Sequence, residues 1–97
     1  MAVLVVAEVA GATAEQDAAM MKMLDVESSP PAGGWLRMAG PMAGGWRIVT
    51  VWDSEADFER FRDERLVPAL ASAGRAVPTV EIWPIETLHT FRAVRAL

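Results

Sequence analysis

The segment Trp46-Arg47-Ile48-Val49-Thr50-Val51-Trp52 carries the side chains best suited to hold a small organic molecule. It is nearly all β-branched or aromatic, so it predicts a β-strand. Side chains alternate along a strand, which places Trp46, Ile48, Thr50 and Trp52 on one face. This face could wall an aromatic pocket, with Thr50 as the hydrogen-bonding group for a flat ligand. A core or interface stripe explains the same pattern and is the commoner case.

Three further residues are candidates for this site. His89 could act as a general acid or base because its unperturbed pKa lies near neutrality, although a lone histidine in a weakly patterned tail is more often a surface residue. Glu8 could project into the interior as a base, or simply mark the end of its apolar strand before Gly11. Trp83 could extend the aromatic wall, as could Trp35, but a slip of one residue in strand register reverses the face.

Several classes of function are excluded by composition. The chain has no cysteine and one histidine, so we expect no metal site. No glycine-rich turn leads into a helix through Lys-Ser or Lys-Thr, and we expect no nucleotide cofactor. A net charge of −4 argues against a nucleic-acid partner. The apolar run at residues 1–7 is far shorter than the roughly 20 residues of a membrane helix. We therefore expect a cytoplasmic protein that binds no membrane.

The order of the predicted elements indicates the fold. Their ranges are strand 3–9, helix 13–25, strand 34–39, strand 46–52, helix 54–73 and strand 79–83. This βαββαβ order on a short chain is typical of the ferredoxin-like plait, an α+β fold with a four-stranded antiparallel sheet and two helices on one face. A length of 97 residues suits a single domain over 1–97, with 88–97 as a C-terminal tail.

Local signals support these boundaries. Thr13 and Gln16 have the spacing of a capping box, and Ser54 is a second helix cap. Residues 40–45 read as a hairpin turn because they hold three glycines and a proline. Pro68 predicts a kink or a new helical turn, since it lacks a backbone donor.

Both faces of the sheet read as apolar, which predicts a homodimer. The first strand is apolar at both parities, and so is the strand at 46–52. A plait covers only one sheet face with helices, so the other would be an apolar patch too large for a monomer. We expect two copies to pack sheet against sheet, with Trp46, Ile48 and Trp52 in the enclosed interior.

The stretch Gly45-Trp46-Arg47-Ile48-Val49-Thr50-Val51-Trp52-Asp53-Ser54-Glu55, followed by Phe58, Phe61 and Leu66-Val67-Pro68-Ala69-Leu70, resembles a known group. It is similar to the dimeric α/β-barrel superfamily and, within it, to small proteins like the antibiotic-biosynthesis monooxygenases. The resemblance implies a cofactor-independent oxygenase of polycyclic phenols or quinols, a haem-degrading relative, or a member without known activity.

Two functions from different classes follow. The first is a monooxygenase-like protein that binds a hydrophobic aromatic metabolite in a cavity of the dimer, with cofactor-independent oxidation implied by the resemblance. The second is a non-catalytic ligand-binding or structural homodimer. The chain has no tyrosine, and the helix after Trp52 lacks the histidine that many monooxygenase-like proteins carry there. These departures make the second function nearly as well supported as the first.

Overall fold

The chain forms a two-layer α+β structure. The computed structural model describes residues 1–93 and 97. In chain order the elements are β1 (Val3–Ala10), α1 (Ala14–Leu24), β2 (Gly34–Met42), β3 (Gly45–Trp52), α2 (Glu55–Phe61), the π-helix η1 (Arg62–Leu66), α3 (Val67–Ser72) and β4 (Val80–Pro84). The predicted βαββαβ order is confirmed, with α2, η1 and α3 together forming the second helical segment.

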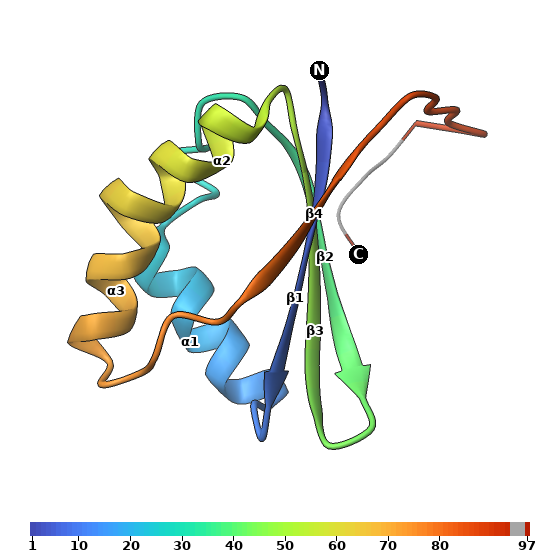
Figure 1. Ribbon diagram of the computed structural model, residues 1–97. Coiled ribbons are helices and arrows are strands. Elements are labelled where there is room, and N and C mark those ends of the chain that lie inside the picture. Colours follow the sequence, from blue (N-terminus) through green and yellow to red (C-terminus); the bar gives the residue numbers. More distant parts are fainter. Residues whose placement is uncertain (94–96) are drawn as a thin grey trace.

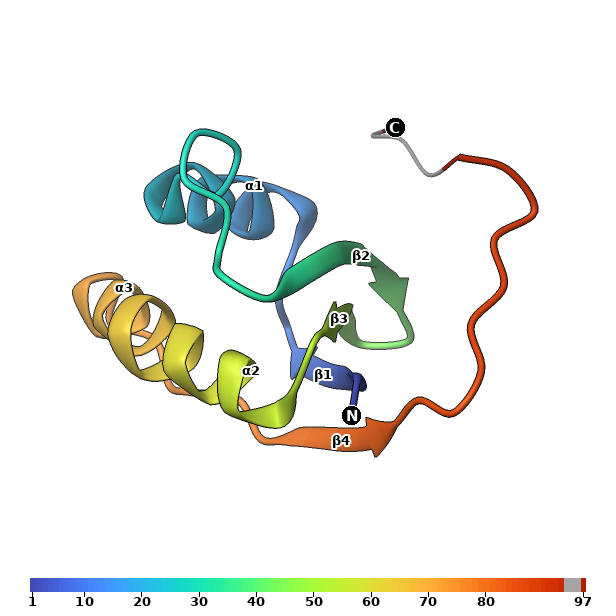
Figure 2. The ribbon, with the colours of Figure 1, turned by 90° about the horizontal axis from the view of Figure 1, so that it is seen from above.

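The sheet has the strand order β2-β3-β1-β4, and its pairings are antiparallel. Figure 1 shows the sheet nearly edge-on, with all the helices on one side. The view from above agrees, and in both views the segment after β4 runs on the side of the sheet away from the helices (Figures 1 and 2). The arrangement is the ferredoxin-like plait that the sequence predicts.

The tryptophan row of β3 faces the helices, which corrects one expectation. Thr50 pairs with Val5 and Trp52 pairs with Val3, so these side chains share a face of the sheet. Trp52 packs on Phe58 and Phe61 of the helical layer, with ring centroids 5.8 and 5.3 Å apart. We expected this row on the uncovered face. The alternation of side chains could not predict which row of β3 faces the helices, because both rows are apolar.

The hairpin between β2 and β3 is tighter than predicted. Strand β2 continues to Met42, so residues expected in a turn are paired in the sheet. Only Ala43 and Gly44 lie between the strands, and Gly44 has a φ of 78°, which suits glycine. Pro41 is tolerated in this strand because β2 lies at the sheet edge.

Both predicted helix caps are present. Thr13 accepts a hydrogen bond from the Gln16 amide, and the Gln16 side chain accepts one from the Thr13 amide. Ser54 accepts from the Asp57 amide at the start of α2. These bonds satisfy amides that have no partner inside the helix. The entry of both helical segments is therefore set by local sequence.

The new helical turn predicted at Pro68 is present as α3 (Val67–Ser72), and the π-helix η1 precedes it. Pro68 has no N–H to donate to the carbonyl of Glu64, and its ring would crowd that carbonyl in a regular α-helix. In η1 the Val67 amide instead donates to the carbonyl of Arg62, five residues back. The wider turn accommodates the proline without ending the helical segment.

The buried side chains form two clusters rather than one. The first joins the sheet to α2 through Val3, Val5, Trp52 and Phe58. The second joins α1 to α3 through Met20, Leu24 and Leu70. Phe61 packs against both clusters. The helical layer thus contacts the sheet near Trp52 through α2, whereas α1 and α3 pack against each other.

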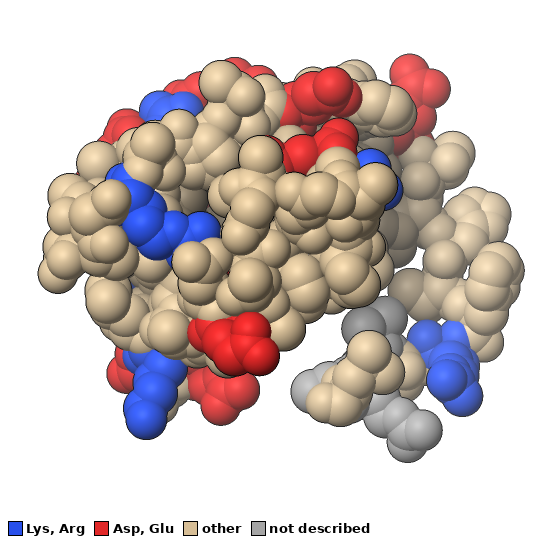
Figure 3. Space-filling view, turned by 90° about the horizontal axis from the view of Figure 1, so that it is seen from below, with Lys and Arg blue, Asp and Glu red and all other residues tan. Residues whose placement is uncertain are grey.

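Charged side chains are scattered on the surface, as Figure 3 shows for the side seen from below. Broad areas between them carry no charge in this view. Among the described residues, no helix combines the length and the apolar character that crossing a membrane requires.

Candidate functional site

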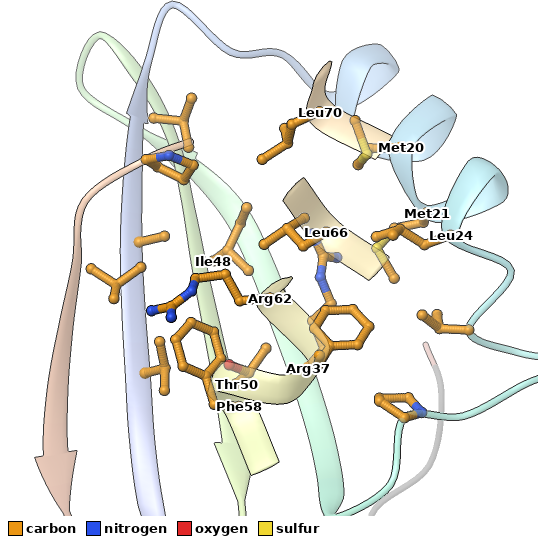
Figure 4. A pocket seen from close by; sticks show the side chains of 18 of the residues that line it. Met20, Met21, Leu24, Arg37, Ile48, Thr50, Phe58, Arg62, Leu66 and Leu70 are labelled. Atoms are coloured by element: carbon orange, nitrogen blue, oxygen red, sulfur yellow. The ribbon is translucent and has the colours of Figure 1, made fainter. Parts of the chain in front are cut away.

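A cavity of about 650 Å³ lies between the sheet and the helical layer. Figure 4 shows side chains from strands and helices converging on it. It is mostly apolar, and its volume is within the ~300–1,000 Å³ of small-molecule sites. The second cluster accounts for the space, because it draws α1 and α3 together and contains no side chain from the sheet.

The floor of the cavity is the row Trp46, Ile48, Thr50 and Trp52 of β3. The Thr50 hydroxyl accepts a hydrogen bond of 2.8 Å from Trp52 Nε1, which leaves the hydroxyl hydrogen free to donate. Trp46 Nε1 is buried and has no hydrogen-bond partner among the described residues. A buried donor without an acceptor is uncommon in proteins. The floor therefore holds one buried donor without an acceptor and a hydroxyl hydrogen that is free to donate.

A charged pair closes one side of the cavity. Arg37 of β2 donates from both terminal nitrogens to the two carboxylate oxygens of Asp17 on α1, and one of these contacts is 3.2 Å. The side chains are 26% and 15% exposed. A bidentate pair of this kind is stronger than a neutral hydrogen bond and fixes the orientation of both groups. It ties α1 to β2 across the cavity.

The π-helix contributes a second guanidinium. Arg62 lines the cavity beside Phe58, with its guanidinium carbon 5.9 Å from the ring centroid. Its Nε donates to Asp63 at 2.9 Å, and this hydrogen bond is the main cause that raises the pKa of Arg62 above its ordinary value. Burial acts in the opposite direction and is outweighed. Arg62 is therefore a permanent cation at the cavity.

Three of the residues predicted for the site come together in the structure. Trp46, Thr50 and Trp52 line the same cavity, as the alternation along the strand implied. The cavity itself lies within one chain, between sheet and helices. The expectation that this row borders a space between two sheets is corrected.

The other three predicted residues do not line the cavity. Glu8 is exposed and pairs with Arg47 at 3.3 Å, so it does not project into the interior as a base. Trp83 is 58% exposed and pairs in register with Leu4 on the opposite sheet face. His89 is exposed in the segment after β4. The structure therefore does not bring all six predicted residues to the cavity within the chain.

Sequence reasoning missed the charged members of the cavity. The pattern of arginines and acids at 59–65 reads as a solvated helix face, and Arg60 fits that reading because it is exposed and pairs with Asp57. Arg62 does not. The signal that could have found it is its spacing of four residues from Phe58, which places the two side chains on one face of a regular helix.

The described residues bring no three His, Asp or Glu side chains together as a metal site.

Comparisons with known proteins bear on the fold. No family model matches the sequence, and no curated protein is similar enough to match it. Solved structures do match. A candidate antibiotic biosynthesis monooxygenase from Chloroflexus aurantiacus is 16% identical, with a TM-score of 0.64 over 95% of this chain and 100% of that one.

Two other structures match over similar spans. SnoaB from Streptomyces nogalater, a cofactor-independent oxygenase, is 14% identical with a TM-score of 0.57, over 95% of this chain and 97% of that one. Rv0793 from Mycobacterium tuberculosis is 14% identical with a TM-score of 0.65, over 93% of this chain and 100% of that one. The chain has the fold of the antibiotic biosynthesis monooxygenase-like structures. Identities this low show the fold alone.

The Asp17–Arg37 pair can be tested by a double-mutant cycle. We expect Asp17→Ala to lower the free energy of unfolding by about 1–3 kcal/mol, because Arg37 is left partly buried without its partner. Arg37→Met should cost a similar amount, and the double variant should cost clearly less than the sum. Urea denaturation gives the three values. Arg60→Ala, which breaks an exposed pair, should cost at most about 0.5 kcal/mol. Strictly additive effects of Asp17→Ala and Arg37→Met would show that the pair contributes nothing.

Proposed function

We propose that the chain binds a flat, hydrophobic aromatic metabolite in the cavity between its sheet and its helices. The observation that carries the proposal is the floor of β3, where a hydroxyl with a free hydrogen, that of Thr50, lies among the aromatic and aliphatic side chains of a mostly apolar cavity. A planar ring system would cover the apolar surface, and an oxygen atom on it would accept a hydrogen bond from Thr50.

We further propose that the bound metabolite is oxidised by O2 without a cofactor. The likeness to SnoaB, a cofactor-independent oxygenase, supports this activity by analogy of fold. A substrate of the anthrone type could supply the electrons itself. Conversion of its CH2 group to a carbonyl releases four electrons, which reduce O2 to the carbonyl oxygen and one water. The balance requires no external reductant.

The alternative is a binding protein without catalysis, and the types of residue that line the cavity favour it. The sequence has no tyrosine, and its one histidine is exposed outside the cavity lining. Asp17, the carboxylate among the lining residues, is held by Arg37. The described lining residues therefore include no free carboxylate or imidazole that could accept a proton from a substrate carbon.

We also propose that two copies pair through the uncovered sheet face. Its apolar side chains are Leu4, Val6, Leu36, Met38, Val49, Val51 and Trp83. Met38 and Trp83 are more than half exposed in the single chain. A face of this kind on an isolated molecule favours association.

The cysteine-free sequence suits a reducing compartment, and we assign the protein to the cytoplasm.

Ligand binding is the first test. Isothermal titration with 1,8-dihydroxyanthraquinone, a stable flat quinone, should give saturable binding to the folded protein. Ile48→Trp should weaken it by at least about tenfold, because the larger ring fills space at the cavity floor. Met23→Trp adds the same side chain at an exposed position and should leave binding unchanged. Equal weakening by both variants would contradict the assignment of the cavity.

Oxygen consumption separates the two functions. With anthrone as substrate, we expect uptake above the uncatalysed rate that persists in EDTA and needs no added iron or flavin. His89→Ala should change turnover by less than about twofold, because His89 lies outside the cavity lining. A loss of about 100-fold would restore the assignment of His89 as acid or base. Binding without uptake would establish the non-catalytic alternative.

Association is tested by light scattering. A homodimer should have a mass near twice 10.5 kDa. An interface near 800 Å² per partner would bury roughly 1,000 Å² of apolar surface, which contributes about 25 kcal/mol before the costs of association are subtracted. The loss of translational and side-chain freedom removes most of this free energy. Val49→Asp should give monomer or aggregate, since two unpaired carboxylates would be buried. Ala18→Asp, on the exposed side of α1, should leave the dimer intact. A parent protein that is a folded monomer at micromolar concentration would overturn the proposal.

A further inference from the structure

The cavity has a charge opposite to that of the protein. The chain carries a net charge of −4. The charged residues that line the cavity are Arg37, Arg62, Arg75 and Asp17, three cations and one anion. Arg37 and Asp17 neutralise each other as a bidentate pair. Arg62 pairs with Asp63, which lies outside the lining, and Arg75 has no ion pair among the described residues, so both present positive charge to the cavity.

Arg62 is the cation best placed to meet a ligand. Figure 4 shows its side chain among those that line the cavity, and its guanidinium lies over the ring of Phe58. It is 34% exposed, and its Nε is bound to Asp63 on the outer side of the helix. Its two terminal nitrogens make no hydrogen bond to the described residues. These nitrogens present a free planar fork of donors.

The local backbone explains this placement. In a continuous α-helix of 3.6 residues per turn, the side chains in line with Phe58 would be close to 62, 65 and 69. Arg62 therefore lies in line with Phe58 by ordinary helical spacing. The π-helix inserts about one extra residue beyond it, so that Leu66 and Leu70, rather than 65 and 69, continue this line along the cavity. Arg65 is turned away and donates to the carbonyl of Leu24 at 2.7 Å. Arg62 is thereby held beside the aromatic wall.

We propose that the aromatic ligand carries a carboxylate, which Arg62 binds. This inference rests on the proposed binding function and specifies its substrate class. A carboxylate matches the planar fork of a guanidinium with two parallel hydrogen bonds. The ring system of the same molecule would lie on the apolar walls and the β3 floor. Arg75, for which the described residues provide no ion pair, adds to the attraction from the loop before β4.

The test compares a carboxylate with its neutral isostere. Isothermal titration at pH 7 uses anthracene-9-carboxylate and anthracene-9-carboxamide, which share ring system and shape. The parent protein should bind the carboxylate at least about tenfold more tightly, as a charge-assisted hydrogen bond predicts. Arg62→Gln should abolish this preference and leave carboxamide binding within about threefold. Arg62→Lys, which keeps the charge without the fork, should show an intermediate preference. Arg60→Gln removes the same charge from the exposed side of α2 and should change neither affinity.

The outcomes separate the two proposals. Equal affinity of the parent for both ligands, or an undiminished preference in Arg62→Gln, would overturn the carboxylate assignment while cavity binding stands. Failure of the folded parent to bind either ligand would overturn the cavity function and the assignment with it. Circular dichroism of each variant confirms that the comparison is made on folded protein.

Discussion

The contact of Trp52 with Phe58 and Phe61 is the constraint on which the rest of the structure depends. Trp52 is 3% exposed and lies in the cluster that joins the sheet to the helical layer. Because side chains alternate along β3, fixing Trp52 toward the helices also fixes Ile48 and Thr50 on that side. The same contact sends Val49 to the other face. One aromatic cluster thus decides which row floors the cavity and which is left for a partner.

The helical layer could have closed the cavity, and the distribution of its large side chains prevents this. Met20, Leu24 and Leu70 pack against one another, so α1 and α3 satisfy their apolar faces without reaching the sheet. The bidentate Asp17–Arg37 pair then spans the remaining distance with long polar side chains. Space is left because the apolar contacts of α1 and α3 are with each other, and the long Asp17–Arg37 pair links α1 to the sheet. An interior of this kind gains stability from a ligand that completes its packing.

Much of the fold could be predicted from the sequence, because the signals were local. The capping box at Thr13 and the β-branched run before Trp52 depend on neighbours in the chain, and the structure bears out both. The facing of β3 could not be predicted, because both of its parities are apolar and only a tertiary contact chooses. Arg62 was missed for a different reason. Its spacing of four residues from Phe58 is a local signal, but the alternating acids and arginines around it indicated a solvated helix face.

The two faces of β3 therefore have separate physical reasons to be apolar. The row with Ile48 faces the helical layer and lines the cavity, so its residue types determine which molecules the cavity could bind. The row with Val49 meets no helix, so its composition requires another cover if the apolar surface is to leave water. A strand buried for one reason would alternate with polar residues. Apolar residues on both faces of β3, in an antiparallel sheet with helices on one side, support both proposals, a ligand within the fold and a second copy on the uncovered face.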